Sequence, residues 1–385
     1  MYKIYDILII GGGISACTFI SDYLRRGFNG KIGIIEMGRN LGGRCSSRNS
    51  SKNKGWILNH GAPNFNISNK SNNPLLDEFM KNLLDNNYIK RDDSLFITLD
   101  HNYKFSYANN NDFYSGDVFS PVTNMRNLAY QIINLNNTKN NVDFFFNTVV
   151  HDLDFNQNEW NISTNKGKIL RSKLLISASN LIIHPRSKKI LDLNQIPLRK
   201  AIKKYKNKQI DETLDIVNDQ NYIQRINFLI YTKSDYKFKD CSYKKNIHFL
   251  FTEEFEKNIG FERIIFQKQD NEKLGIVIHT KNNNFLSNDL ISDNQIILNS
   301  NLLEKFNQVF KDSPLINELL DYDDISVMRW SASQPTGRAL PTRFKFCEQY
   351  KIGFCGDWLD FEGFGKTEGA ILSALSLIED IKTFL

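Results

Sequence analysis

A glycine-rich turn near the start of the chain constrains its fold more than any other feature of the sequence. Residues 4–10 form a short, mostly apolar run that contains Asp6, which is typical of a strand buried in a parallel sheet. Residues 14–26 carry apolar side chains at helical spacing. Between them, Gly11 and Gly13 permit a tight turn and let a phosphate approach bare backbone, while the helix N-terminus offers unpaired N–H groups to the anion. The segment therefore predicts a strand, a turn and a helix that bind the phosphates of a nucleotide.

The next apolar run places an acidic residue at a second informative position. Residues 31–36 predict another buried strand, and this strand ends at Glu36, about 20 residues after Ala16. At that spacing a carboxylate accepts hydrogen bonds from ribose hydroxyls and would repel a 2′-phosphate. The combination predicts a Rossmann-type dinucleotide-binding fold, and by itself it leaves both NAD and FAD open.

Three further segments resemble motifs of the superfamily of FAD-containing amine oxidases, phytoene desaturases and renalases. Gly42-Gly43-Arg44 follows the acid closely, as in the second dinucleotide motif of that superfamily. Residues 59–62 (Asn-His-Gly-Ala) are similar to the segment that these proteins lay along the flavin ring, with an amide in place of the usual acid. Near the C-terminus, Gly356-Asp357 ends a short apolar strand, and residues 363–370 open the last helix. The resemblance implies FAD, bound without a covalent link, rather than NAD.

The resemblance also implies a role for each matching position. Gly43 would let its loop pass close to the pyrophosphate, and Arg44 would offer a guanidinium fork to phosphate or flavin oxygen. Asp357 would bind a ribityl or pyrophosphate oxygen. Val150 would meet the adenine through its backbone, with Val149 as the one-residue alternative. The residues expected to bind FAD are Gly11, Gly13, Ile14, Ser15, Ala16, Glu36, Met37, Arg39, Gly43, Arg44, His60, Gly61, Ala62, Val150, Gly356, Asp357, Glu368, Gly369 and Ala370.

Residues 329–335 resemble a renalase segment in their first arginine, their tryptophan and their proline. This branch of the superfamily removes a hydride from misreduced dihydronicotinamide isomers and passes the electrons to oxygen, so the resemblance implies a small reduced substrate. Trp330 is a candidate wall of the substrate pocket, although core packing explains it equally well, and His184 is another candidate. No side chain is predicted as a dedicated acid or base, because the flavin carries the chemistry.

Two other functions remain open. An amine oxidase or a carotenoid-type desaturase of the same superfamily would share the FAD motifs, and the nearby aromatic residues Trp358 and Phe361 do not decide between them. A protein that binds FAD without turnover would also keep Glu36, Arg44 and Asp357. The electron acceptor, oxygen or another, is not determined by the sequence.

The expected fold class is α/β. A Rossmann-type FAD-binding domain, a parallel sheet with helices on its faces, is expected over residues 1–70, 120–180 and 340–385. An inserted α+β substrate domain with a mixed or antiparallel sheet is expected over 71–119 and 181–339. The expected helices and strands cover residues 74–84, 124–135 and 367–384 (helices), and 95–107, 142–150, 159–164, 168–177 and parts of 222–280 (strands).

Composition narrows the function classes. The 385 residues carry a formal net charge of +6, without the basic stripe expected of a nucleic-acid-binding protein. Residues 199–208 are rich in Lys and Arg and are interpreted as a solvated helix face. The five cysteines show no metal-ligand spacing, which favours a reducing compartment over disulfides or a zinc site. No apolar stretch is long enough to span a membrane, and Asp6 argues against a signal peptide, so we expect a cytoplasmic protein.

Overall fold

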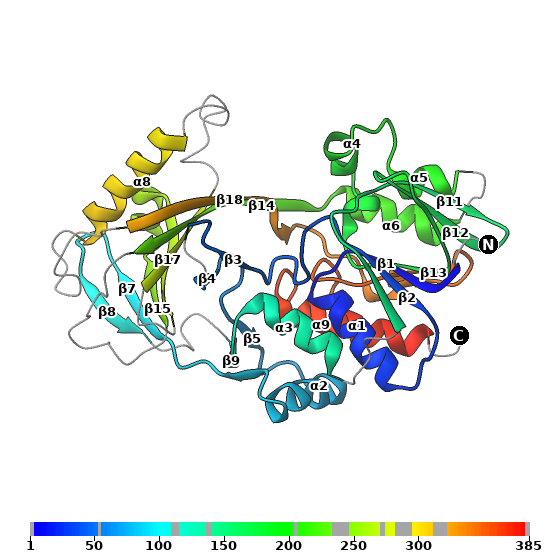
Figure 1. Ribbon diagram of the computed structural model, residues 1–385, viewed down its shortest axis with the longest axis horizontal. Coiled ribbons are helices and arrows are strands. Elements are labelled where there is room, and N and C mark those ends of the chain that lie inside the picture. The colour runs from blue at the N-terminus through cyan, green and yellow to red at the C-terminus, as the bar shows by residue number, and fades with distance from the viewer. Residues whose placement is uncertain are drawn as a thin grey trace.

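The computed structural model describes residues 4–52, 55–108, 115–135, 141–203, 207–232, 246–269, 274–281, 295–310 and 322–381. These residues form two lobes, each built on a large β-sheet (Figure 1). The long strands β14 (Asn221–Thr232) and β18 (Tyr322–Thr336) run from one lobe to the other. The first strand and the last helix lie together in the lobe on the right of Figure 1, so distant parts of the chain build one lobe.

The sheet of that lobe is parallel at its centre. Its described strands follow the order β10-β2-β1-β13-β12-β11, and β20 pairs with the C-terminal end of β13 and with β19. Strands β10, β2, β1, β13 and β20 run parallel, whereas β11, β12 and β19 pair antiparallel with their neighbours. The bounds are β1 Ile4–Ile10, β2 Ile32–Ile35, β10 Val142–Phe145, β11 Val150–Asn156, β12 Glu159–Thr164, β13 Ile169–Ser177, β19 Phe346–Cys347 and β20 Ile352–Phe354.

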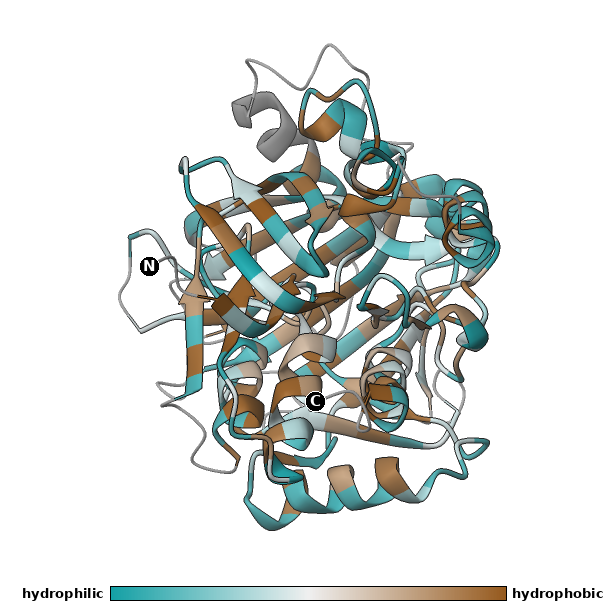
Figure 2. Cartoon of the chain, turned by 90° about the vertical axis from the view of Figure 1, so that its right-hand side faces the viewer, coloured by the Kyte–Doolittle hydropathy of each residue, from teal (hydrophilic) through white to brown (hydrophobic). Residues whose placement is uncertain are grey.

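Helices cover both faces of this sheet. Alternate side chains of β1 enter two different hydrophobic cores, because successive residues of a strand point to opposite faces. Ile7 and Ile9 pack in the core under α1, α3 and α9, whereas Leu8 and Ile10 pack in the core that contains α5 and α6. The alternation is visible as bands of hydrophobic and hydrophilic residues along the strands in Figure 2. The helices of the lobe are α1 Ile14–Arg25, α3 Met125–Asn134, α4 Arg186–Ile190, α5 Pro197–Ala201, α6 Lys208–Asn218, α9 Thr367–Ile381 and the 3-10 turns η3 Asn180–Ile182 and η6 Thr342–Phe344.

The second lobe contains a mixed sheet. Its described strands follow the order β18-β14-β17-β16-β15-β7-β8, and all neighbours are antiparallel except β15 and β7. Side chains of α7 and α8 pack in the core on one face of it. The opposite face turns towards β3 and β4, where Trp56 and Leu58 form a small separate core with it. The remaining bounds of the lobe are β7 Leu95–Leu99, β8 Phe105–Ala108, β15 Asn246–Phe251, β16 Phe261–Lys268, β17 Leu274–Lys281, α7 Glu253–Ile259 and α8 Gln295–Phe310.

Short elements connect the two lobes. Strands β3 and β4 form a hairpin-like pair, and β5, β9 and β6 form a small antiparallel sheet. Helix α2 begins at Pro74, where the side chain of Asn73 accepts hydrogen bonds from two backbone N–H groups of the first turn. The bounds are β3 Ser47–Asn49, β4 Ile57–Asn59, β5 Phe65–Ile67, α2 Pro74–Asp85, β6 Ile89–Arg91 and β9 Asp117–Pro121.

The predicted fold class, a Rossmann-type parallel sheet with helices on its faces and a second mixed sheet, is confirmed. Two local predictions were wrong. The strand expected over 142–150 is two strands, because the chain turns between them at Asn147, whose φ of +50° does not fit a strand. The single basic helix face expected over 199–208 is divided, because Asn207 caps a new helix, α6, through a hydrogen bond from the backbone N–H of Ile210. Residues 204–206 and 382–384 of the expected helices lie outside the described residues.

The division into two domains stays a prediction. Within the range expected for the substrate domain, α5 and α6 pack on the parallel sheet, whereas β7, β8 and β14–β18 belong to the mixed sheet. No described helix combines the length and apolar character needed to cross a membrane. The described cysteines, Cys17, Cys45, Cys347 and Cys355, are buried and unpaired, and Cys241 lies outside the described residues.

Candidate functional site

The glycine-rich turn leaves the start of α1 open. Gly13 is the N-cap of α1, no side chain caps the helix, and no acidic residue lies in its first turn. A Cβ added at Gly13 would meet no atom within 4 Å, whereas one at Gly11, where φ is +102°, would lie 3.0 Å from the Cβ of Ser179. The uncapped N–H groups and the positive end of the helix dipole therefore face open space that suits an anion.

The second glycine loop passes directly beside this turn. The backbone N–H of Gly42 donates to the carbonyl of Gly12 at 2.8 Å, and Gly13 and Gly42 form an isolated bridge. A Cβ added at Gly43 would lie 3.3 Å from the Cα of Gly13, so the two backbones approach more closely than side chains would comfortably allow. The two motifs predicted to bind one pyrophosphate are therefore in contact.

Glu36 lies at the end of β2 and is held by backbone groups. Its two carboxylate oxygens accept hydrogen bonds from the N–H groups of Gly12 (2.6 Å) and Gly38 (2.5 Å). Each oxygen keeps a further lone pair, which a ribose hydroxyl could use. The next predicted positions, Met37 and Arg39, are exposed beside it.

Arg44 and Asp357, which are 313 positions apart, form a two-pronged ion pair. The guanidinium nitrogens donate to the two carboxylate oxygens at 2.7 and 2.5 Å, and Nη1 also donates to the carbonyl of Ser333 on β18 at 3.2 Å. Burial opposes the charge of Arg44, but the Asp357 carboxylate more than offsets it and raises the pKa of Arg44. This ion pair thus brings three segments together: the second glycine loop, the end of β20 and the long strand β18.

His60 stacks on Trp330 at this junction. Their ring centroids are 5.4 Å apart with planes 24° from parallel. His60 Nε2 forms a hydrogen bond with Ser46 Oγ at 3.1 Å, whereas Nδ1 has no partner among the described residues. Burial, with a smaller contribution from the charge of Arg48, lowers the pKa of His60 to about 4, so the ring is neutral at physiological pH. Trp330, a candidate for pocket wall or core, is only partly buried and packs on the segment expected to face the flavin.

The backbone of residues 59–62 is fixed against Arg44 and α3. A Cβ at Gly61 would lie 1.8 Å from the carbonyl oxygen of Arg44, which also accepts a hydrogen bond from the N–H of Ala62 at 3.0 Å. The side-chain oxygen of Asn59 accepts hydrogen bonds from Ser47 Oγ and from the N–H of Met125, the first residue of α3. Asn59 thus orders the start of a helix, a role that the sequence motif did not reveal.

The start of α9 lies close to Asp357. The carbonyl of Asp357 accepts a hydrogen bond from the N–H of Gly365 at 2.7 Å, and Gly369 and Ala370 lie in the first turns of the helix. Glu368 is fully buried, and its Oε1 accepts hydrogen bonds from the N–H of Ser68 and from Ser71 Oγ. The Glu368 side chain therefore anchors β5 and its following turn, and its contact with FAD stays a prediction.

The structure separates two other candidates. Both backbone groups of Val149 are bonded to Asn165, which favours Val150 for the adenine contact. His184 uses both ring nitrogens: Nδ1 accepts from the N–H of Arg186 at 3.0 Å, and Nε2 lies 2.9 Å from the carbonyl of Gln220. These bonds favour a structural role for His184 over contact with a substrate.

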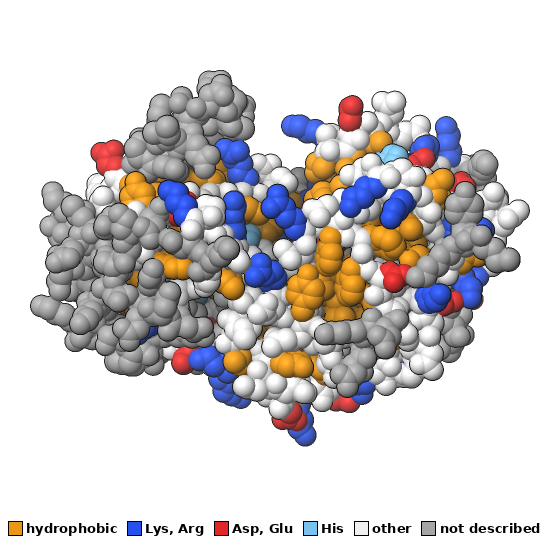
Figure 3. Space-filling model, viewed as in Figure 1, with side chains coloured by type: hydrophobic (Ala, Val, Ile, Leu, Met, Phe, Trp, Pro, Cys, Tyr) orange, Lys and Arg blue, Asp and Glu red, His pale blue; other side chains and the backbone are white. Residues whose placement is uncertain are grey.

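A polar group on the mixed sheet, next to His60, was not predicted from the sequence. This group comprises Asn227 on β14, His279 on β17 and Arg263 on β16, which are cross-strand neighbours. Alternating polar and aromatic residues predicted these strands, but their mutual register could not be predicted from one sequence. Figure 3 shows a hollow between the two lobes with Lys and Arg side chains around it and a His side chain within it.

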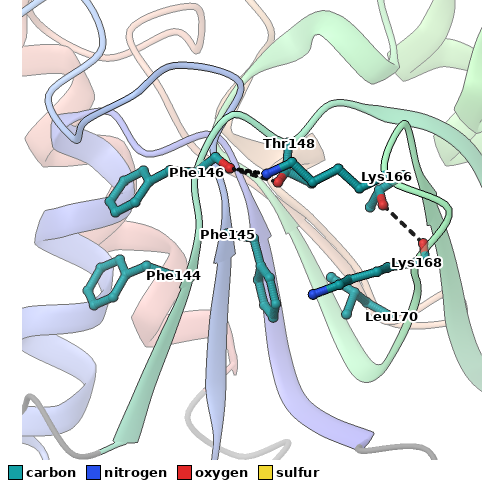
Figure 4. A pocket seen from close by; sticks show the side chains of 8 residues that line it. Phe144, Phe145, Phe146, Thr148, Lys166, Lys168 and Leu170 are labelled. Atoms are coloured by element: carbon teal, nitrogen blue, oxygen red, sulfur yellow. Dashed lines mark hydrogen bonds between the residues drawn. The ribbon is translucent and has the colours of Figure 1, made fainter.

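A separate small pocket lies beside β10 and β11–β13 (Figure 4). Phe145, Lys168 and Leu170 line it, and the carbonyl of Phe146 accepts a hydrogen bond from Lys166 Nζ at 2.8 Å. Its volume of about 170 Å³ is below the roughly 300 Å³ at which ligand pockets begin. We assign no function to it.

Comparison with known proteins agrees with this geometry. Residues 9–83 match the family of NAD(P)-binding Rossmann-like domains. This segment contains the glycine-rich turn, Glu36, the second glycine loop and residues 59–62. No curated protein sequence matches the chain.

Solved structures share the fold of the whole chain. A putrescine oxidase bound to putrescine superposes with a TM-score of 0.67 at 9% identity over 100% of both chains. A cyclohexylamine oxidase from Brevibacterium oxydans IH-35A superposes with a TM-score of 0.66 at 10% identity over 99% of both. A fatty acid isomerase from P. acnes that produces CLA has a TM-score of 0.63 at 12% identity over 99% of both. At these identities the similarity establishes the two-lobed fold.

Proposed function

We propose that this protein is an FAD-dependent oxidoreductase. The observation that carries the proposal is the meeting of four separate segments at one site: the Gly11–Ala16 turn, the loop at residues 42–44, the strand end at Asp357 and the start of α9. A nucleotide turn alone would suit NAD. The additional segments are joined to the turn and to one another by these contacts, and a longer cofactor with a flavin ring would need groups beyond the turn itself.

The residues present fit FAD. The uncapped start of α1 and the open space at Gly13 suit a pyrophosphate, and Glu36 keeps lone pairs for ribose hydroxyls. Arg44 keeps N–H groups beyond those that it donates to Asp357 and Ser333, and each Asp357 oxygen keeps a further lone pair, so the ion pair could still donate to and accept from the phosphate and ribityl region. These residues would hold the cofactor, and the flavin would supply the hydride acceptor.

The chain's own residues would position the substrate. His60 and Trp330 form a flat aromatic pair beside the segment expected to face the flavin, which suits the alignment of a planar ring. Because His60 is neutral, it can offer a hydrogen bond without adding charge to the site. We propose a small reduced substrate, a dihydronicotinamide isomer, since the renalase-like segment that suggested it carries Trp330.

Covalent attachment of FAD is not expected. Cys355 is fully buried, and burial raises its thiol pKa to about 12, so the nucleophilic thiolate does not form near neutral pH. Acid denaturation of the purified protein should therefore release all flavin into the supernatant. Flavin that stayed on the polypeptide would overturn this statement.

The visible spectrum of the purified protein tests the main proposal. Flavin absorption bands should be present, or should appear after FAD is added and excess is removed. If no bands appear, the chain is not a flavoprotein and the proposal fails. With flavin present, anaerobic mixing with dihydronicotinamide isomers should bleach the bands.

The second candidate is an amine oxidase, since a putrescine oxidase and a cyclohexylamine oxidase share the fold. Bleaching by putrescine or cyclohexylamine, with none by the nicotinamide isomers, would favour it. Bleaching by carotenoids would favour a desaturase instead. A flavoprotein that none of these compounds bleaches would fit FAD binding without turnover.

A further inference from the structure

The two long strands that join the lobes carry a bulge beside the proposed cofactor site. Strands β14 and β18 run from one lobe to the other (Figure 1). On β14, Ile223 pairs with Gln334 of β18, and Arg225 pairs with Trp330. Residues 331–333 of β18 therefore stand opposite a single residue of β14. Extra residues of this kind bend a strand and redirect its side chains, and they are frequent next to functional sites.

Ser333, the last residue of this bulge, forms hydrogen bonds through both its side chain and its backbone. Its hydroxyl donates to the carbonyl of Ile223 at 2.7 Å and accepts a hydrogen bond from Nη1 of Arg225, also at 2.7 Å. Its carbonyl oxygen accepts the 3.2 Å hydrogen bond from Nη1 of Arg44. This serine therefore connects an arginine of the mixed sheet with the arginine of the second glycine loop.

Arg225 is itself fixed by a second bulge, on β16. The pairing of β16 with β17 shifts between residues 261 and 263, which leaves Glu262 as the extra residue of its strand. The Glu262 carboxylate accepts hydrogen bonds from Nε and Nη2 of Arg225 at 2.5 and 2.6 Å, across the intervening strand β17. Burial disfavours the charge of Glu262, but the hydrogen bond and charge of Arg225 more than offset it and lower the pKa of Glu262 to about 2. The pair is therefore ionised at neutral pH, and it leaves Nη1 of Arg225 to hold Ser333.

The bonds of Arg44 leave one edge of its guanidinium plane open. Asp357 occupies the edge formed by Nη1 and Nη2, and the carbonyl of Ser333 accepts the outer N–H of Nη1. The N–H of Nε and the outer N–H of Nη2 lie parallel along the remaining edge, without a partner among the described residues, and the side chain is 38% exposed. Two parallel N–H donors match two oxygens of a phosphate. The contact with Ser333 therefore fixes which edge of Arg44 is open to an anion.

We infer that Ser333, Arg225 and Glu262 are positioning residues, which hold Arg44 with its open edge turned towards a phosphate of FAD. None of the three needs to touch the cofactor. Glu262 balances the charge of Arg225, and Asp357 balances that of Arg44, so two arginines can meet at one serine. This inference rests on the proposed function, because it explains how a residue of the proposed FAD site is oriented.

Variants of Ser333 and Glu262 test the inference through FAD affinity, measured by quenching of flavin fluorescence. Ser333→Ala removes the hydroxyl that Arg225 holds and should weaken FAD binding about fivefold or more, whereas Ser333→Thr keeps the hydroxyl and should stay within about twofold of the wild type. Glu262→Gln should also weaken FAD binding about fivefold or more. The matched control is Glu159→Gln, since Glu159 also pairs with an arginine and is similarly exposed (24% against 23%), but on β12 of the other sheet. It should leave FAD affinity unchanged.

A double-mutant cycle shows whether Ser333 acts through Arg44. In an Arg44→Met background, the loss of FAD affinity caused by Ser333→Ala should shrink to less than about twofold, because the group that Ser333 positions is gone. Equal losses in both backgrounds would overturn the inference, since Ser333 would then affect FAD binding by another route. If Arg44→Met binds no FAD, the threonine variant and the Glu159 control decide: a loss in Ser333→Thr or in Glu159→Gln as large as that in Ser333→Ala would overturn the inference.

The two proposals fail in distinguishable ways. A wild-type protein that binds no FAD overturns the proposed function, and the positioning role with it. A wild-type protein that binds FAD, with affinity unchanged in Ser333→Ala and Glu262→Gln, overturns only the positioning role. If Ser333→Ala does not fold, shown by the melting temperature of the FAD-free protein, Glu262→Gln and its control decide the inference, because glutamine keeps the size of the side chain.

Discussion

Replacing Glu36 with glutamine tests both the structural and the cofactor role of this residue. The carboxylate accepts two backbone hydrogen bonds, from Gly12 and Gly38. Hydrogen bonds to a charged group contribute about 1.5–3 kcal/mol each. Glutamine keeps one oxygen acceptor but turns an NH₂ group towards the other N–H. We therefore expect the FAD-free protein to lose about 2–3 kcal/mol of stability against unfolding.

Urea denaturation of the FAD-free protein measures the stability loss, and quenching of flavin fluorescence measures FAD affinity. The matched control is Glu78→Gln, which breaks an exposed ion pair with Arg25 and should cost no more than about 1 kcal/mol. In Glu36→Gln we also expect FAD to bind roughly tenfold or more weakly, because the ribose hydroxyls lose a charged acceptor. A stability loss equal to that of the control would refute the structural reasoning, and unchanged FAD affinity would show that Glu36 is not the ribose ligand.

Three shorter predictions concern other parts of the site. His60, with a folded pKa of about 4 against 6.5 for the free side chain, is protonated more readily in the unfolded chain. The contribution of His60 to the free energy of unfolding should thus be fully present above pH 6.5. The free energy of unfolding should fall by up to about 3 kcal/mol as the pH is lowered to 4. In His60→Gln, denaturation curves recorded over the same pH range should show a smaller fall. Gly42→Ala places a Cβ 2.3 Å from a carbonyl oxygen, so it should lower the melting temperature and abolish FAD binding. The control is Gly27→Ala, which is also at positive φ but in open space and should cost only about 1 kcal/mol of backbone strain. Equal losses of melting temperature in the two variants would refute the close approach at Gly42. Cys17 and Cys355 are fully buried, and burial raises the pKa of both thiols. Both should therefore react with a thiol reagent only after denaturation. If mass spectrometry detects modification of either residue in the native protein, their burial is contradicted.

The sequence by itself determined the local geometry of the proposed cofactor site. The glycine turn and the start of α1 depend on residues within one short segment, because positive φ and an uncapped helix start are properties of the local backbone. The acid at the end of β2 also follows from local spacing. Strand pattern likewise predicted that two different sheets are present.

Only the tertiary structure decided which side chains meet. Arg44 and Asp357 pair across 313 positions, and His60 stacks on Trp330 across a similar separation. Asn227 and His279 become neighbours through strand register, and a shift of one residue would turn either side chain to the opposite face. Register is fixed by how the whole sheet packs, so a single sequence does not contain it in readable form. The glycine turn and the acid that follows it were therefore predictable from local sequence, whereas the pairing of side chains from distant segments was not.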